Sequence, residues 1–269
     1  MPPSALRRLC LITGASAGIG AAFARVYAAH GYDVALTARR TGRLEALAGD
    51  IRAQFGVEAL VFTADLAAPG AVDALIAEIA KTGRTVDALV NNAGYGLPGT
   101  YARTSWSDQQ AFLQVLVVAV CELTHKLLPG MVERGFGRVI NVASLAGLTP
   151  GMPSHTLYGA AKAFVVKFSQ SLHLETLDTG VHVTALCPGL TRSEFHDVNG
   201  VRAQMDGIPG FMWLDAETVA EAGYAAAEAN RPVCITGWPN RVIAALCKLL
   251  PESLLMIVTR RAALKVRAL

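Results

Sequence analysis

The chain alternates short runs of consecutive apolar residues with longer stretches in which apolar residues recur every three or four positions. The short runs are rich in Val, Ile and Leu, which is typical of strands covered on both faces. The longer stretches have the period of helices with one apolar face. This alternation predicts an α/β fold: a Rossmann-like, doubly wound, seven-stranded parallel sheet with helices on both faces. The predicted strands cover residues 9–13, 33–37, 59–62, 88–90, 138–142, 182–186 and 233–235, and the predicted helices cover residues 18–30, 40–55, 71–81, 107–134, 156–179 and 216–229.

No linker, repeat or low-complexity stretch interrupts this pattern. We therefore expect a single domain over residues 1–240, followed by a helical extension over residues 241–269. The extension is apolar and basic, and Pro251 divides it into two amphipathic helices, neither long enough to span a bilayer. It suits a cover over a ligand cleft or an oligomer interface, and a weak contact with a membrane surface is the alternative.

The least regular stretch covers residues 191–214 and contains Gly207, Pro209 and Gly210. It follows the carboxyl end of a predicted strand, which is where ligands of such sheets bind. Its large apolar side chains predict an apolar ligand cleft. These side chains are Phe195, Ile208, Phe211, Met212 and Trp213.

Composition and charge exclude several classes of protein. The 269 residues carry a net charge of only +3, and the charges of both signs are mixed, so no basic face for nucleic acid is expected. The five cysteines are scattered and form no CxxC pair or Cys/His cluster, which argues against a metal site or a disulfide framework and favours a reducing cytoplasm. The apolar run at residues 9–12 is too short for a secretory signal, and no run of 18 apolar residues predicts a membrane span.

A glycine-rich turn, TGASAGIG at residues 13–20, joins the first predicted strand to the first predicted helix. Gly14 permits a tight turn, Gly18 lets the backbone approach a diphosphate, and Gly20 allows the helix and the strand to pack closely. The amino end of the helix offers free N–H groups to an anion. The position of the turn favours dinucleotide binding over a purely structural turn, although its spacing differs from the commoner GxGxxG. Ser16 and Ile19 belong to the same predicted binding turn.

The second predicted strand runs into two arginines, Arg39 and Arg40. An acidic residue at this place would bind the 2′-hydroxyl of an adenosine ribose and repel a 2′-phosphate. Two guanidinium groups instead suit a phosphate dianion, which predicts NADP(H) rather than NAD(H) as the cofactor. The alternative is that one arginine only caps the next helix, and Arg40 suits that role better than Arg39.

Six features occur in the same order along residues 7–240 as in the short-chain dehydrogenases/reductases, and the chain resembles the single-domain branch of that family. Each feature follows a predicted strand or lies on the next helix, so one edge of the sheet would gather all of them. They are the glycine turn, Asp65 with Leu66, the NNAG stretch at residues 91–94, Ser144, Tyr158 with Lys162, and Pro188 with Gly189.

The resemblance implies a binding role for most of these residues. Asp65 and Leu66 would contact the adenine, and Pro188, Gly189 and Thr191 would hold the nicotinamide end. The ribose side of the pocket would be lined by Asn92, Ala93 and Gly94. Members of the family form homodimers or homotetramers, which here would pair the helices at residues 107–134 and 156–179.

By the same resemblance, Ser144, Tyr158 and Lys162 are catalytic and interconvert a carbonyl and a secondary alcohol in a small-molecule substrate. Lys162 follows Tyr158 by four residues, so both lie on one face of a helix. A nearby ammonium group lowers the pKa of a tyrosine, which would make Tyr158 a general acid/base. Ser144 would donate a hydrogen bond to the substrate oxygen. A helix in which Tyr158 only packs would leave Ser144 and the glycine turn unexplained.

One position departs from the family pattern. The family carries a fourth catalytic residue, an asparagine, in the long helix before the fifth strand, and Leu116 stands at that place. That asparagine helps to hold a water beside the lysine and accompanies a helix kink, so we expect a straighter helix and an altered proton relay. Two interpretations remain: an active enzyme, or an NADP(H)-binding sensor or scaffold with little turnover. An epimerase or dehydratase of the extended branch is disfavoured by the spacing of the glycine turn and by the short C-terminal part.

Overall fold

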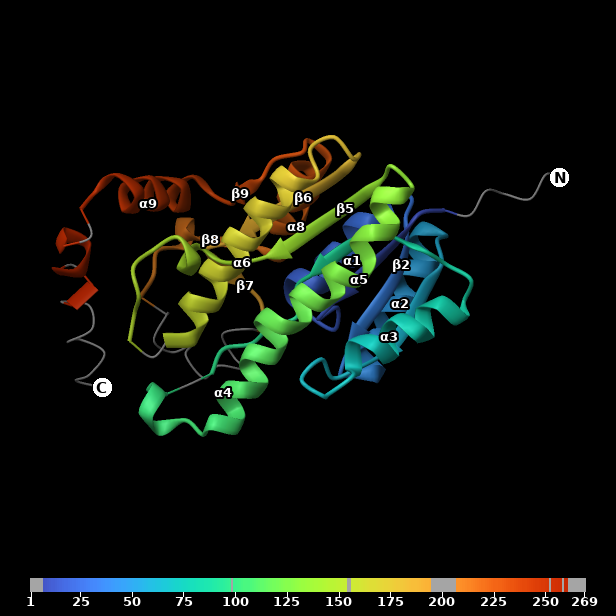
Figure 1. The fold of residues 1–269 in the computed structure, drawn as a ribbon, viewed down its shortest axis with the longest axis horizontal. Helices are drawn as coiled ribbons and strands as arrows, with labels where there is room; N and C mark the ends of the chain where they lie inside the picture. The colour runs from blue at the N-terminus through green and yellow to red at the C-terminus, as the bar shows by residue number, and fades with distance from the viewer. Residues whose placement is uncertain are drawn as a thin grey trace.

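The computed structural model describes residues 7–97, 99–153, 156–194, 207–251, 253–257 and 259–260. Seven parallel strands form one sheet in the order β3-β2-β1-β4-β5-β6-β9, which confirms the predicted doubly wound topology (Figure 1). The carboxyl ends of parallel strands meet at one edge of the sheet, and the predicted site residues lie along that edge. The strands are β1 (Leu9–Thr13), β2 (Asp33–Ala38), β3 (Ala59–Thr63), β4 (Val86–Asn91), β5 (Gly137–Val142), β6 (Val181–Cys187) and β9 (Val233–Ile235).

Helices cover both faces of the sheet (Figure 1). Alternate residues of β1 show why its sequence is apolar throughout: Cys10 and Ile12 pack into one helical layer, and Leu9 and Leu11 pack into the other. The first layer contains α1 (Gly18–Ala29), α2 (Thr41–Phe55) and α8 (Ala216–Glu228). The second layer contains α3 (Ala71–Lys81), α4 (Trp106–Leu113), α5 (Ala119–Glu133) and α6 (Thr156–Glu175).

The long helix predicted over residues 107–134 contains an irregularity at its centre. A π-helical turn, Gln114–Val118, joins α4 to α5, and the N–H of Ala119 donates to the carbonyl of Gln114. The expectation that Leu116 gives a straighter helix is therefore wrong, because the backbone is wound more widely around that residue. The segment Trp106–Glu133 contains a window of 18 residues that is apolar enough to cross a membrane, by length and composition only. Its side chains at Phe112 and Leu123 nevertheless pack into the core.

The stretch expected to be irregular, residues 191–214, contains more structure than predicted. A short strand β7 (Leu190–Arg192) pairs in parallel with β8 (Trp213–Asp215), and a 3₁₀ turn, Gly210–Met212, precedes β8. Both strands contain polar residues and form no run of consecutive apolar residues, so the sequence pattern did not reveal them. Residues 195–206, which include Phe195, lie outside the described residues.

The C-terminal part continues from the sheet as α9 (Trp238–Leu249), which begins before the expected boundary at residue 241. Helical residues follow again at 253–257, after Pro251, as the sequence predicted. In Figure 1, α9 extends from β9 toward one end of the molecule. Residues 261–269 lie outside the described part of the chain.

Candidate active site

The glycine turn between β1 and α1 requires its glycines. Gly14 and Gly18 have φ angles of +66° and +53°, which side chains rarely adopt. A Cβ atom on Gly14 would lie 2.9 Å from the Cα of Ala93, and one on Gly20 would meet the carbonyl oxygen of Gly14. Ile19, between them, packs against the core. The turn therefore brings bare backbone to the amino end of α1, where an anion is favoured.

Asn92 holds this turn in place from the neighbouring strand β4. Its side-chain amide donates to the carbonyl oxygens of Thr13, at 2.9 Å, and of Gly14, at 3.3 Å. The hydroxyl of Thr13 in turn accepts the backbone N–H groups of Asn92 and Ala93, each at 2.9 Å. The Asn92 side chain thus supports the turn, while the predicted contact of Asn92, Ala93 and Gly94 with a ribose stays a prediction.

Arginines gather beside the turn at the start of α2. The backbone of Arg40 occupies the N-cap position of α2, as the alternative interpretation expected. Its side chain, however, turns back and donates to the Ser16 hydroxyl at 2.9 and 3.1 Å. Arg39 is exposed. Burial raises the pKa of Tyr95, and the positive charge of Arg39 opposes this rise.

Two residues join this group that the sequence reasoning missed. Arg40 donates to a carboxylate oxygen of Glu194 at 3.0 Å, and Arg43 donates to both oxygens of Glu194 at 2.6 Å. Arg43 follows Arg40, the N-cap residue of α2, by three residues, so helical spacing was a signal that would have placed the two side chains on the same side of the first turn. No comparable signal pointed to Glu194, which is 154 residues from Arg40.

The segment after β6 reaches the glycine turn through Ser193 rather than Thr191. A Cβ atom on Gly18 would lie 2.9 Å from the Cβ of Ser193. Thr191 is buried, and its hydroxyl donates to the carbonyl of Gly189 at 3.3 Å. A nicotinamide contact of Thr191 stays a prediction, and Ser193 is a further candidate for the phosphate end of the cofactor.

Pro188 and Gly189 form a turn that is braced from two sides. The carbonyl of Pro188 accepts the backbone N–H of Leu145 at 2.8 Å, which links it to the segment after β5. A Cβ atom on Gly189 would overlap the side chain of Asn240, near the start of α9. The helix α9 is therefore fixed directly behind the turn predicted to hold the nicotinamide end.

The predicted catalytic residues come together from β5 and α6. Ser144 follows β5, caps a 3₁₀ turn and accepts the N–H of Ala146 at 3.1 Å. Its side chain is also hydrogen-bonded to that of Tyr158. The ammonium group of Lys162 is 5.8 Å from the centre of the Tyr158 ring and donates to the carbonyl of Val142 at 2.7 Å. The sequence prediction of one joint site for Ser144, Tyr158 and Lys162 thus has a matching geometry.

The electrostatics of the pair differ from the sequence expectation. Burial raises the pKa of Tyr158, and the hydrogen bond from Ser144 only opposes this rise. Burial lowers the pKa of Lys162 to about 8, with an opposing effect of Cys187. We expected the Lys162 ammonium to lower the pKa of Tyr158, but the ammonium is directed at the Val142 carbonyl, and loss of solvation dominates at the tyrosine.

Leu116 lies in a dry part of the site. It is only 1% exposed, and a Cβ atom on Gly94 would lie 3.7 Å from its Cγ. It belongs to the same core cluster as Phe112 and Ala161, with Tyr158 packed against that cluster. The side chain at this position therefore supplies apolar packing between β4 and α6, where an asparagine would place an amide.

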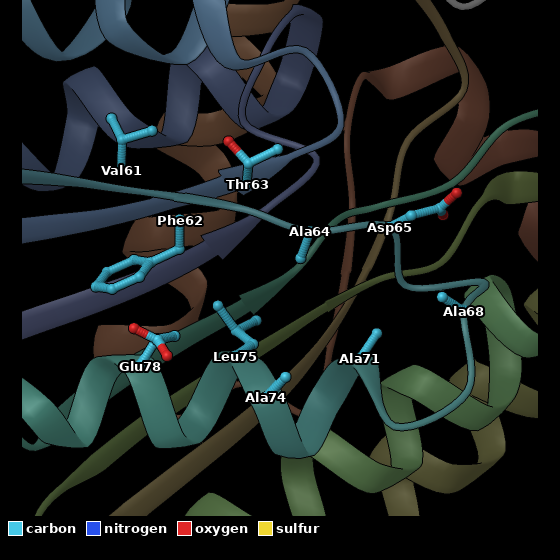
Figure 2. A pocket seen from close by; sticks show the side chains of 10 residues that line it. All are labelled: Val61, Phe62, Thr63, Ala64, Asp65, Ala68, Ala71, Ala74, Leu75 and Glu78. Atoms are coloured by element: carbon cyan, nitrogen blue, oxygen red, sulfur yellow. The ribbon is translucent and has the colours of Figure 1, made fainter.

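At the other end of the site, Asp65 and Leu66 follow β3. Asp65 is exposed and accepts the backbone N–H of Ala67 at 3.0 Å, and Leu66 is buried. Asp65 also lies at the rim of a groove of about 370 Å³ between β3 and α3. Figure 2 shows Phe62 and Glu78 facing this groove from opposite sides. Ser144, Tyr158 and Lys162 are not among its lining residues.

Comparison with known proteins supports the same interpretation. A family model described as short chain dehydrogenase matches residues 8–201. The chain is 39% identical to a sulfoacetaldehyde reductase from Chromohalobacter salexigens over 215 residues. The aligned part covers 78% of this chain and 84% of that protein. It is 36% identical over 192 residues to an NADP-dependent 3-hydroxy acid dehydrogenase from Salmonella typhi, covering 71% and 75%. A short-chain dehydrogenase from Sphingobium yanoikuyae, solved in complex with NADPH, has a TM-score of 0.79 and 28% identity, covering 91% of this chain and 97% of that one.

Proposed function

The chain belongs to the short-chain dehydrogenase family, and from this premise we propose that it is an NADP(H)-dependent oxidoreductase that interconverts a carbonyl and a secondary alcohol. One observation carries the proposal. Ser144, Tyr158 and Lys162 converge where β5 ends, at the same edge of the sheet as the glycine turn between β1 and α1. A protein that only binds a dinucleotide does not need these three side chains to converge.

The residues beside the glycine turn suit NADP(H). Gly14, Gly18 and Gly20 leave room for a diphosphate, which the free N–H groups of α1 attract. Arg39 and Arg40 supply positive charge where the 2′-phosphate would lie. Asp65 with Leu66 would bind the adenine, and Pro188 with Gly189 the nicotinamide end. When bound, the cofactor supplies or accepts the hydride.

The catalytic residues handle the proton. Tyr158 donates its hydroxyl proton to the carbonyl oxygen during reduction and takes a proton from the alcohol in the reverse direction. The Ser144 oxygen accepts the N–H of Ala146, and its hydroxyl hydrogen, which faces Tyr158, would turn to the substrate oxygen when a substrate binds between the two side chains. Lys162, whose ammonium group donates to the Val142 carbonyl, places a positive charge close to Tyr158 and would also bind the ribose of the cofactor.

We infer a hydrophobic substrate. Ile208, Met212 and Trp213 are partly buried on the segment that leads into β8, and Phe211 stacks on Trp238 at a ring distance of 6.1 Å. These side chains offer apolar contact area close to the turn at Pro188 and Gly189, where the reacting carbon would sit.

Leu116 favours a second candidate, an NADP(H)-binding protein with little turnover. The two candidates separate when NADPH oxidation is measured against a panel of aldehydes and hydrophobic ketones, with NADH as the cofactor control. An enzyme turns over, prefers NADPH and loses its activity in Tyr158→Phe. Tight NADPH binding without turnover on any substrate, together with activity in Leu116→Asn, would instead favour the binding protein.

The assembly and the cell compartment are also proposals. Val118, Phe164 and Leu174 expose apolar side chains on the layer of α5 and α6, and they support a homodimer or homotetramer through this layer. Light scattering coupled to size-exclusion chromatography measures the mass directly, and Phe164→Glu should reduce it. All five cysteines are free, which supports a reducing cytoplasm.

We propose that residues 1–240 form the cofactor-binding and catalytic domain and that residues 241–269 extend it. The helix α9 exposes Trp238, Val242 and Leu246 along one side, beside Lys248. Such a face covers a cleft or interface, or makes a weak contact with an anionic membrane surface. Co-sedimentation with anionic vesicles should fall in Leu246→Glu if the contact is with lipid, whereas loss of the oligomer without any sedimentation favours the interface.

A further inference from the structure

Glu194 has an unusual place for an acidic residue. It lies beside the turn expected to bind a cofactor diphosphate, and its carboxylate is held by Arg40 and Arg43. One nitrogen of Arg43 donates to both carboxylate oxygens at 2.6 Å, and a guanidinium group binds a phosphate as well as a carboxylate. The hydrogen bonds from the two arginines lower the pKa of Glu194, so it is negatively charged at neutral pH.

The contacts of Arg40 place this carboxylate beside the phosphate-binding turn. The same guanidinium group that donates to Glu194 also donates to the hydroxyl of Ser16 in that turn. The preceding residue, Ser193, lies against Gly18. Glu194 is therefore fixed between the turn and the start of α2, where the end of β2 directs a 2′-phosphate in a dinucleotide-binding sheet.

We propose that Glu194 occupies the place of the 2′-phosphate of NADP(H) and competes with it for Arg40 and Arg43. The inference rests on the proposed cofactor. A phosphate monoester carries nearly two negative charges at neutral pH. It cannot share these two arginines with a carboxylate without strong repulsion, so Glu194 leaves them when the phosphate binds. A cofactor without the 2′-phosphate does not bind Arg40 and Arg43, so its affinity does not depend on Glu194.

The competition sets the strength of cofactor discrimination. Glu194 weakens the binding of ligands that carry a 2′-phosphate and leaves other adenosine ligands unaffected. Its side chain and those of Arg40 and Arg43 are all about half exposed, so each ion pair is worth little alone. A ligand with a 2′-phosphate must break both ion pairs to bind. Removing the carboxylate should therefore increase the affinity for such a ligand by about 3- to 30-fold.

The test uses 2′,5′-ADP and 5′-AMP as probes, which differ by the 2′-phosphate and undergo no reaction. Calorimetry measures both dissociation constants for the unmodified protein, Glu194→Gln and Asp215→Asn. Asp215 is a matched control, because it is an exposed acid paired with Arg192 on the neighbouring strand. We expect Glu194→Gln to bind 2′,5′-ADP about 3- to 30-fold more tightly, with 5′-AMP unchanged, and the gain to shrink at high salt. Asp215→Asn should change neither constant by more than about twofold.

A second substitution checks the route of the effect. In an Arg43→Gln background, the change from Glu194 to Gln should increase the affinity for 2′,5′-ADP only slightly, because Arg43, which contacts both carboxylate oxygens, is no longer there to be competed for. The proposal is overturned if Glu194→Gln leaves the affinity for 2′,5′-ADP unchanged or weakens it, since Glu194 would then organise the arginines rather than compete. If neither the unmodified protein nor Glu194→Gln prefers 2′,5′-ADP to 5′-AMP, the proposed NADP(H) preference fails. A preference for 2′,5′-ADP that Glu194→Gln leaves unchanged overturns the competition alone.

Discussion

Replacing Leu116 by asparagine tests whether this part of the site is packed and dry. The side chain is 1% exposed and joins the core cluster between β4 and α6. Removing a buried leucine side chain from an apolar site costs about 1.5–3 kcal/mol of stability. Leaving the new amide without partners adds about 1–3 kcal/mol. The substitution should therefore lower the free energy of unfolding by about 2.5–6 kcal/mol.

Urea unfolding at one fixed protein concentration measures this change, with Leu116→Met as the control. Methionine keeps the volume and the apolar character, so it should cost less than about 1.5 kcal/mol. A loss of less than about 1 kcal/mol in Leu116→Asn would refute the reasoning, because the amide would then have found water or a polar partner in the π-helical turn. An equal loss in both variants would show that shape, rather than polarity, governs this position.

Three further predictions follow from the same geometry. Gly14→Ala should lower the melting temperature more than Gly31→Ala and should weaken NADPH binding measured by fluorescence. Both glycines have a positive φ, but only a Cβ atom on Gly14 meets other atoms. Equal effects of the two substitutions would mean that backbone strain alone matters. Lys162 has a pKa of about 8 in the fold against 10.5 for an unperturbed lysine, so the unfolded chain binds more protons between these values and stability rises with pH across them. Lys162→Met should therefore be more stable than the unmodified protein near pH 7, with a gap that narrows by about 3 kcal/mol toward pH 10, and a constant gap in denaturant titrations would contradict the lowered pKa. The raised pKa of Tyr158 keeps its hydroxyl group protonated at neutral pH. Steady-state rates of carbonyl reduction should therefore be constant through neutral pH, while rates of alcohol oxidation should rise into the alkaline range. An oxidation rate that levels off below pH 7 would show that the tyrosine ionises easily.

Sequence patterns were sufficient for the sheet because its central strands are buried on both faces. Strands β1 and β5 are fully buried, and a run of consecutive apolar residues such as that at residues 9–12 leaves little choice of structure. The π-helical turn Gln114–Val118 could not be found in this way. It shifts a hydrogen bond by one residue inside a continuous apolar helix, and no proline or glycine marks it.

The candidate site was predictable where function depends on spacing along one element. Tyr158 and Lys162 lie on the same helix, and Ser144 follows the strand next to it, so their meeting is a consequence of the fold. Glu194 is different, because its contacts with Arg40 and Arg43 join segments that are distant in the sequence. A single exposed acid after a short strand carries no periodic signal, and only coordinates reveal its partners.

The tyrosine shows why proximity does not determine the sign of an electrostatic effect. Helical spacing brought Lys162 near Tyr158, and that alone favours the phenolate. Burial acts on both groups at once: it raises the pKa of Tyr158, lowers the pKa of Lys162, and directs the ammonium to the Val142 carbonyl. The neutral phenol is the form that donates a proton to a carbonyl oxygen, so the fold by itself prepares the site for reduction. Oxidation needs the phenolate, and this requires a further positive charge beside the ring, which an oxidised nicotinamide provides and a reduced one does not.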